Sequence, residues 1–408
     1  MKFVKPFKDI RMKDVPLVGG KTASLGEMYS IGLPVPNGFS VTADAYRHFI
    51  SENNLDQKIR YLLRSVKSIK TLKKSGSEIR ALIKESKMPK EMEEEILASF
   101  RDLDSVCVAV RSSATAEDLP DASFAGQQES FLNVTEKDLI RKVKECFASL
   151  FTDRAISYRN DKGFDHFKIA LSVAVQKQIF SRSSGVMFTI DPDNGHKNFI
   201  VINSSYGLGD YIVQGKVTPD EFRIFKKNLR IVEKQLGRKA IMEIRSPFGV
   251  KKKKVSPTMQ KQFSISDHEA EELAKYGMLV ERHYKRPMDI EWCKDEDRLY
   301  IIQARPETVH SRSASLTEYA MKQKGTVIAE GISIGRKIAS GKARVIKSPK
   351  QINIFRQGEI LVTRNTDPDW EPIMKIAAAI ITEEGGRTSH CAIVAREIGV
   401  PAVIGVKN

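Results

Sequence analysis

The hydrophobic and polar positions along the chain repeat with two periods, one typical of strands and one typical of helices. Short apolar runs predict strands at 106–110, 131–134, 199–203, 221–225 and 377–381. Two further runs, at 169–180 and 185–190, predict a pair of strands joined by a tight turn. Helical spacing predicts helices at 22–30 and 42–50, several within 51–100, one at 136–160 and one at 268–283. The mixture of both element types predicts an α/β (mixed α+β) fold.

The clearest pair of strands is a β-hairpin predicted at 288–306. Period-two alternation places Asp289 and Glu291 on one face of its first strand. It likewise places Gln303 and Arg305 on one face of the second strand. If these two faces coincide, hard oxygen ligands for Mg²⁺ and a guanidinium fork for a polyphosphate converge. A ladder of salt bridges on a surface hairpin is the alternative interpretation.

Two stretches of the N-terminal half have features of phosphate-binding loops. Lys21 follows a pair of glycines at a predicted helix start, but the first glycine of a Walker A loop is missing. Arg111 follows a predicted buried strand, and small and hydroxyl residues then fill 121–130, including Ser123 and Gly126. Such a loop can approach phosphates closely and donate backbone N–H groups to them. An ordinary surface loop is the alternative.

The stretch 385–405 predicts a turn, a helix and a strand around His390. Two glycines form the turn, and Thr388 or Ser389 can cap the helix. His390 then lies in the first helical turn, where backbone N–H groups and the helix dipole stabilise an anion. A capping or packing histidine is the alternative. Because Arg387 and Thr388 suit phosphate, and because imidazole can carry a phosphoryl group, we predict a phosphorylated histidine.

Composition narrows the class of protein. The 408 residues and 41% hydrophobic content predict a globular protein of at least two domains. No long apolar run and no signal-peptide core are present, so we expect a cytoplasmic protein without a membrane partner. The four cysteines are scattered singly, which favours reduced, buried thiols. The net charge of +16 comes without a nucleic-acid motif, so a solvated lysine-rich surface is favoured over nucleic-acid binding, and an anionic substrate such as ATP would benefit from the positive field.

The run GGRTSHCAIVAREIGVPAVIG resembles the phosphohistidine signature of the phosphoenolpyruvate-utilising enzymes, with Cys391 where alanine is expected. The following stretches resemble the nucleotide-binding domain of the phosphoenolpyruvate synthases (pyruvate, water dikinases): VGGKTASLGEM, VRSSATAEDLPDASFAGQQESFLNV, SGVMFTID, YGLGD, RPMDIEW and LYIIQARPETV. The resemblance implies an ATP-grasp domain at 1–308, a linker at 309–325 and a swivelling β/β/α phosphohistidine domain at 326–408. The last of these would be incomplete at its C-terminus. Gln178, where methionine is more usual, leaves the adenine pocket undefined.

The resemblance also implies a reaction and roles for residues. His390, Arg387 and Thr388 would be catalytic, with Nε2 of His390 taking the β-phosphoryl of ATP. Mg²⁺ would face Glu291 and Gln303. The ATP-binding residues would be Lys21, Arg111, Ser123, Gly126, Asp289, Glu291, Gln303 and Arg305. The phosphoryl group would then pass to pyruvate, giving phosphoenolpyruvate, AMP and phosphate.

The alternatives differ in the acceptor. A pyruvate phosphate dikinase shares both domains and uses phosphate in place of water. A rifampicin-type phosphotransferase carries a drug-binding domain between them, whereas only 309–325 separates them here. A catalytically incomplete phosphocarrier would act only as a binding partner. In the family, a (β/α)₈ barrel that binds pyruvate follows the histidine domain, so we expect a fragment or a split-gene product. A second chain would then carry the barrel, and this chain would perform only the ATP half-reaction.

Overall fold

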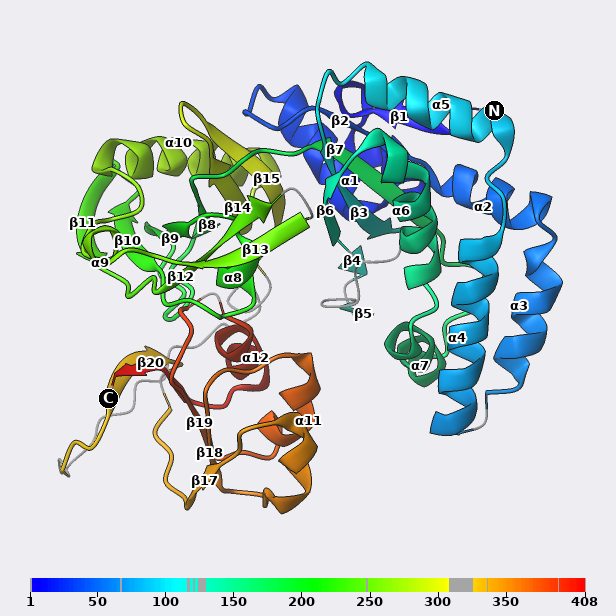
Figure 1. Cartoon of the computed structure of the whole chain (residues 1–408). Helices are drawn as coiled ribbons and strands as arrows, with labels where there is room; N and C mark the ends of the chain where they lie inside the picture. Colours follow the sequence, from blue (N-terminus) through cyan, green and yellow to red (C-terminus); the bar gives the residue numbers. More distant parts are fainter. Residues whose placement is uncertain are drawn as a thin grey trace. The chain divides into compact units, whose positions relative to one another are not determined.

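The computed structural model is a mixed α+β fold with several sheets, as predicted (Figure 1). It divides into two compact units, Met1–Ile179 and Phe180–Asn408. This division differs from the boundary expected near residue 308, which stays a prediction. The structure describes residues 2–66, 68–115, 118–119, 122–123, 130–246, 249–307, 326–335, 337–387 and 389–407.

The first unit contains a five-stranded sheet within its described residues, in the order β1-β2-β7-β3-β6. Its middle strand, β7 (Leu171–Lys177), is buried at six successive positions and pairs antiparallel with β2 and β3. A run of apolar and small residues suits this position because both faces of the strand are covered. The other strands are β1 (Val4–Pro6), β2 (Gly38–Val41), β3 (Val108–Ala114) and β6 (Ser130–Val134), and a separate pair is β4 (Asp118–Leu119) with β5 (Ala122–Ser123).

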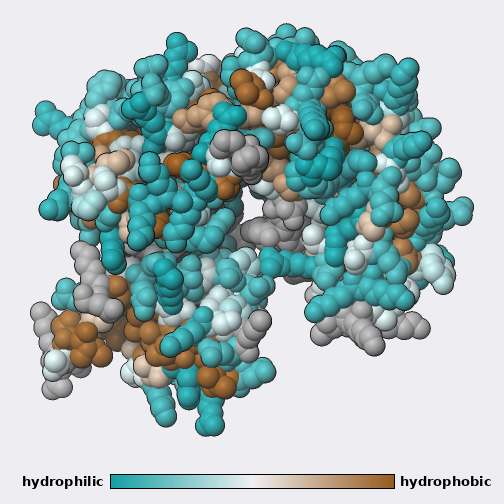
Figure 2. All heavy atoms as spheres, in the orientation of Figure 1, coloured by the Kyte–Doolittle hydropathy of each residue, from teal (hydrophilic) through white to brown (hydrophobic). Residues whose placement is uncertain are grey.

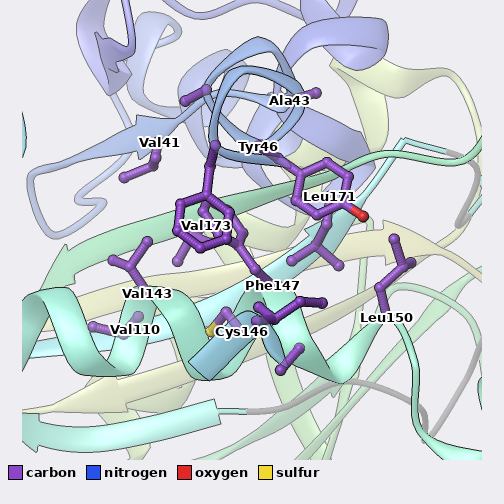
Figure 3. Close-up of a cluster of buried hydrophobic side chains, with 14 of the residues drawn as sticks. Val41, Ala43, Tyr46, Val110, Val143, Cys146, Phe147, Leu150, Leu171 and Val173 are labelled. Carbon is purple, nitrogen blue, oxygen red and sulfur yellow. The ribbon is translucent and has the colours of Figure 1, made fainter. Parts of the chain in front are cut away.

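Helices pack on this sheet and enclose the core of the first unit (Figure 3). Val41, Val173 and Phe147 are fully buried there, and the rings of Tyr46 and Phe147 meet edge to face at 5.3 Å. Each such buried apolar side chain contributes roughly 1.5–3 kcal/mol to stability. The helices are α1 (Val15–Ser30), α2 (Ala43–Glu52), α3 (Leu55–Arg64), α4 (Ile69–Glu85), α5 (Lys90–Arg101), α6 (Glu136–Ser149) and α7 (Asp153–Lys162).

Two predictions for the first unit need correction, and a predicted helix has an additional segment before it. The single helix predicted at 136–160 is two helices, because Thr152 has an extended backbone and caps α7 by accepting the N–H of Ala155. The helix predicted at 22–30 is the second part of α1, because the non-helical backbone of Gly19, with φ of 71°, separates it from a short helical segment that begins at Val15. Arg111 lies inside strand β3 and does not follow it.

The second unit contains a six-stranded antiparallel sheet, in the order β11-β10-β9-β8-β14-β15 among the residues described. β8 therefore pairs with β9 and β14, and the predicted pairing of 169–180 with 185–190 is wrong. β7 instead completes the other sheet. The strands are β8 (Ser183–Phe188), β9 (Phe199–Tyr206), β10 (Asp220–Phe225), β11 (Arg230–Gln235), β14 (Met288–Lys294) and β15 (Leu299–Pro306).

One long helix, α10 (Asp267–Tyr284), packs along this sheet and contacts five of its strands. Its N-terminus is a capping box, in which Ser266 accepts the N–H of Glu269 while Glu269 accepts the N–H of Ser266. Gly277 allows the helix to approach Met187 closely. Smaller elements nearby are α8 (Asp210–Val213), α9 (Pro257–Gln260) and the hairpin of β12 (Ile241–Ser246) with β13 (Gly249–Lys254).

The C-terminal part of the second unit forms its own sheet, in the order β16-β20-β19-β18-β17. The strands β17, β18, β19 and β20 run parallel, and β16 is antiparallel at the edge. Its core includes Ile380, Ala392 and Ile404, all fully buried. The elements are β16 (Glu330–Ile334), β17 (Ala343–Val345), β18 (Ile360–Thr363), α11 (Glu371–Met374), β19 (Ala379–Thr382), α12 (His390–Ile398) and β20 (Ala402–Lys407).

The surface seen in one view of the molecule is largely polar. Figure 2 shows a face on which hydrophilic residues predominate. Across the described ranges, no helix is both long enough and apolar enough to cross a bilayer. All four cysteines are buried free thiols, as predicted.

Candidate functional site

His390 is the first residue of helix α12, as predicted. Ser389 is the N-cap, with an extended backbone and a side chain that accepts the N–H of Ala392 at 3.4 Å. Gly399 ends the helix in the left-handed conformation, with φ of 69°. This geometry places the imidazole beside the backbone donors and the positive dipole end of a nine-residue helix. The position suits an anion carried by the ring.

A hydroxyl that the sequence reading missed holds one nitrogen of this imidazole. Thr366 Oγ1 lies 2.9 Å from Nδ1 of His390, and Thr366 is only 4% exposed. Thr366 follows strand β18, and His390 follows the adjacent strand β19. Because parallel strands end at the same edge of a sheet, the two loops meet there. That topology is the signal by which Thr366 could have been found.

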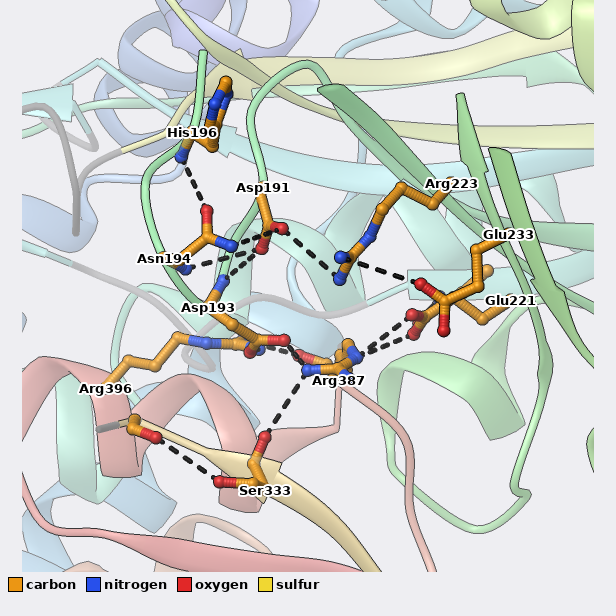
Figure 4. A network of polar contacts seen from close by, with 12 residues as sticks. Asp191, Asp193, Asn194, His196, Glu221, Arg223, Glu233, Ser333, Arg387 and Arg396 are labelled. Carbon is orange, nitrogen blue, oxygen red and sulfur yellow. Dashed lines mark hydrogen bonds and ion pairs between the residues drawn. The ribbon is translucent and has the colours of Figure 1, made fainter. Parts of the chain in front are cut away.

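Arg387 does not point into open solvent, because carboxylates hold its guanidinium (Figure 4). Its Nη1 forms an ion pair with Asp193, and its Nε lies 2.9 Å from Glu221. Nη1 also donates to the carbonyl of Ser333 at 3.4 Å. Thr388, the third residue predicted to be catalytic, lies outside the described residues. The arginine predicted to bind phosphate is therefore paired with two carboxylates in this structure.

A second arginine of α12 joins the same cluster. Nη2 of Arg396 lies 2.7 Å from Asp193, and its Nη1 donates to the carbonyl of Arg387. Burial lowers the pKa of Arg387, and it lowers the pKa of Arg396 to about 10, so Arg396 stays cationic at neutral pH. Burial also raises the pKa of Glu221 to about 7, with Arg223 opposing the rise. Glu221 is therefore only partly ionised near neutral pH, and Asp193 is the carboxylate that pairs with both buried arginines.

The hairpin of β14 and β15 brings together the four side chains predicted to converge. Asp289 is opposite Arg305 and Glu291 is opposite Gln303, so the two faces coincide. Arg305 donates to Oδ2 of Asp289 from Nε at 2.9 Å, and its Nη2 is 2.8 Å from the same oxygen. Burial raises the pKa of Asp289, with Arg305 opposing the rise. The interpretation as a salt-bridge ladder therefore applies to this pair.

Glu291 and Gln303 are the oxygen ligands predicted for a metal. They face each other across the hairpin, and Gln303 is 9% exposed. Within the part of the chain that the structure describes, no cluster of three or more His, Cys, Asp or Glu side chains could hold a metal ion. Two protein oxygens fit Mg²⁺ when phosphates and waters complete its shell. They do not fit a metal held by protein ligands alone.

The remaining predicted nucleotide-binding residues lie in the first unit. Lys21 follows the bend of α1 at Gly19, where the chain packs against Ser113 of β3. Arg111 lies two residues before Ser113 on the same strand. The structure thus puts Lys21 and Arg111 on adjoining elements of one unit. Ser123 is described only as part of β5, and Gly126 lies outside the described residues.

The chain matches two family models and is similar to several named relatives. Residues 15–326 match the family model "Pyruvate phosphate dikinase, AMP/ATP-binding domain", and residues 355–408 match "PEP-utilising enzyme, mobile domain". A phosphoenolpyruvate synthase of Aquifex aeolicus is 49% identical, with 98% of this chain and 51% of that protein aligned. A phosphoenolpyruvate synthase of Pseudomonas aeruginosa is 47% identical, with 100% and 55% aligned.

The chain spans about half the length of these relatives. A phosphoenolpyruvate synthase of Escherichia coli shows the same relation, at 46% identity over 98% of this chain and 54% of the relative. The match at residues 15–326 covers well over half of the chain. The chain therefore belongs to the family defined by the pyruvate phosphate dikinase AMP/ATP-binding domain, and its residues 355–408 match the mobile domain of the phosphoenolpyruvate-utilising enzymes.

Proposed function

We propose that this chain transfers a phosphoryl group from ATP to Nε2 of His390. The single observation that carries the proposal is His390 at the start of α12 with Thr366 2.9 Å from its Nδ1. That contact orients the imidazole through Nδ1, and we assign the reaction to Nε2. The ATP-binding and mobile-domain matches of the chain support the assignment of donor and carrier. We place the boundary between the two functional parts in the segment 309–325.

The transfer is a displacement at the β-phosphorus of ATP. A bond forms from Nε2 of His390 to that phosphorus, the bridge to the α-phosphate breaks, and AMP leaves. Water then removes the terminal phosphate, and phosphohistidine remains. Catalysis of this kind is mainly positioning and neutralisation of charge. Backbone N–H groups of α12, with Arg387 and Thr388, would hold the phosphoryl oxygens.

On the donor side, we assign Lys21, Arg111 and Arg305 to the phosphates of ATP. The loop containing Ser123 and Gly126 would donate backbone N–H groups to the same phosphates. Asp289 would keep Arg305 oriented through the ion pair at 2.8 Å.

Glu291 and Gln303 would hold Mg²⁺ through oxygen atoms. When bound, this ion would neutralise part of the phosphate charge. The two side chains would also fix the position of the phosphates relative to the hairpin of β14 and β15.

The relatives named phosphoenolpyruvate synthase support pyruvate as the final acceptor, giving phosphoenolpyruvate, AMP and phosphate. The matched family description supports pyruvate phosphate dikinase activity, with phosphate in place of water, as a second candidate. Because this chain aligns with about half of those relatives, we assign pyruvate binding to a further domain or a second chain.

The first test replaces the nucleophile. His390→Ala should abolish labelling of the chain by ATP that is radioactive at the β-phosphate, while leaving ATP binding by calorimetry unchanged. The matched control is His268→Ala, since His268 is an exposed histidine of α10. It should label like the wild type. Label retained in the His390 variant contradicts the assignment of this nucleophile.

The second test concerns the acceptor. The purified chain with ATP and pyruvate should release AMP in proportion to enzyme and make no phosphoenolpyruvate. A coupled assay for phosphoenolpyruvate measures this directly. Sustained formation of phosphoenolpyruvate by this chain alone would contradict the assignment of pyruvate binding to a domain elsewhere.

A further inference from the structure

Two carboxylates, one on the six-stranded sheet and one in a loop between its strands, form ion pairs with the segment that carries His390. Asp193 lies in the loop between β8 and β9, and Glu221 lies on β10. Asp193 pairs with both Arg387 and Arg396, and Glu221 pairs with Arg387 (Figure 4). We call Asp193 and Glu221 the carboxylate receptor.

The receptor is largely shielded from water, as are its arginines. The side chains of Asp193 and Glu221 are 15% and 12% exposed, and those of Arg387 and Arg396 are 18% and 5% exposed. Ion pairs so shielded are weakly screened by salt, and removing one partner leaves a buried charge that is costly. Removal of one partner from this contact is therefore costlier than removal of one partner from an ordinary surface salt bridge.

Glycines let the backbones meet beside these ion pairs. A Cβ at Gly215 would lie 2.6 Å from Cβ of Ser389, and one at Gly386 would lie 2.6 Å from Cδ of Pro219. Gly386 and Ser389 flank Arg387 on the turn that leads to His390. A side chain at either glycine would separate the turn before His390 from the segment 215–219. The two glycines therefore permit the close contact between these two backbones.

The guanidinium of Arg387 already faces two anions, Glu221 and Asp193. Its Nε faces Glu221, and its Nη1 faces Asp193 and the carbonyl of Ser333. A phosphoryl group on His390, three residues away, adds up to about two negative charges and strong acceptor oxygens. It competes for the same donors and repels the same carboxylates.

We propose that the carboxylate receptor holds the segment of His390 through Arg387 before phosphorylation, and that the phosphoryl group on His390 displaces the carboxylates from Arg387 and releases the segment. This proposal rests on the proposed function of His390. Arg387 then holds the segment through the carboxylates before phosphorylation and binds the phosphoryl group afterwards. The other charged groups that act on Arg387 are Arg396 and Asp191, and Asp191 pairs with Arg223 at 3.3 Å.

The test measures the distance between two spin labels by double electron–electron resonance. Labels go on Lys227→Cys and Lys347→Cys, since both positions are exposed, while the native cysteines are buried. The unphosphorylated chain should give one narrow distance distribution. Addition of MgATP should broaden this distance distribution. The radioactive phosphate that the chain takes from β-labelled ATP is counted in the same sample.

The decisive variants remove charge and keep size. Glu221→Gln combined with Asp193→Asn should broaden the distribution without ATP, with at least about a tenfold loss of the narrow component. Asp193→Asn alone is the second variant, because it lies in a loop and spares the strands. Glu233→Gln is the matched control, since its carboxylate is 64% exposed and lies 3.7 Å from Arg223. It should leave the distribution narrow.

The outcomes separate the two proposals. A narrow distribution in folded Asp193→Asn and double variants overturns the receptor, whatever the chain does with ATP. A narrow distance distribution in spin-labelled chain that also carries the radioactive phosphate overturns the displacement of the carboxylates from Arg387. Absence of radioactive phosphate on the spin-labelled chain overturns the phosphoryl transfer to His390, and with it the displacement of the carboxylates. The variants measured without ATP still show whether the carboxylate receptor holds the segment of His390.

Discussion

At the scale of single residues, the hydroxyl of Thr366 holds the imidazole of His390 through its Nδ1 atom, at 2.9 Å. His390 was located correctly because a glycine pair, a cap and an apolar helix surround it in the sequence. Thr366 was missed because its contact with Nδ1 joins two loops that lie 24 residues apart. Arg387 was expected to meet phosphate, and its pairing with Asp193 and Glu221 depends on a separate sheet. Local patterns identify side chains but not such distant partners.

The contact of Thr366 with His390 has a measurable consequence. Thr366→Val should slow phosphoenzyme formation by about five- to tenfold, because one hydrogen bond that orients the ring is lost. Thr366→Ser retains the hydroxyl and should restore most of the rate. Rapid-quench labelling with β-labelled ATP measures both. Equal rates in the valine and serine variants would contradict a role for the hydroxyl.

Cys391, where alanine was expected, should be chemically inert despite its place next to His390. It is 2% exposed, and burial raises the pKa of its thiol to about 12. A thiol reacts as its thiolate, so almost none is available at neutral pH. Mass spectrometry after treatment of the native chain with iodoacetamide should find Cys391 unmodified, and denatured chain provides the positive control. Rapid alkylation of the native protein would contradict this.

At the scale of elements, patterns predicted which segments are helices and strands, but not always where they end or what they pair with. The hairpin of β14 and β15 was predicted with the correct facing residues, because a short turn fixes its register. β7 and β8 were both predicted as strands, yet their pairing was wrong. The alternation of apolar and polar residues predicts which side chains share a face of a strand, but it does not predict which strands pair with it. The bend in α1 needed Gly19 and its contact with β3.

Gly19 tests how much this bend contributes to stability. Its φ is 71°, and an added Cβ would lie 2.3 Å from Oγ and 2.6 Å from the carbonyl oxygen of Ser113. Gly19→Ala should therefore lower the free energy of unfolding by about 3 kcal/mol or more. Gly32→Ala is the control, because φ is 80° there but nothing lies within 4 Å. It should cost only about 1 kcal/mol. Urea unfolding measures both, and equal losses would contradict the steric argument.

At the scale of the whole molecule, the fold class was predicted, but the compact units were not. The boundary at Ile179 follows from long-range pairing, since strands from 4–177 close one sheet. The buried cluster of this unit runs from Phe3 to Val175 and includes no residue of the second unit. Such closure is invisible to composition and periodicity. It implies that the first unit has the interactions it needs to fold by itself.

We therefore expect a fragment of residues 1–179 to fold cooperatively. A fragment of residues 1–168 is the matched control, because it lacks only the last strand of the unit, β7, which joins β2 to β3. Its loss removes the buried side chains of Leu171, Val173 and Val175 and leaves two separate strand pairs. Two-stranded sheets are marginal in water, so the shorter fragment should show no cooperative transition by circular dichroism. Comparable thermal transitions in both fragments would contradict the central role of β7, and the absence of a transition in the longer one would contradict its independence.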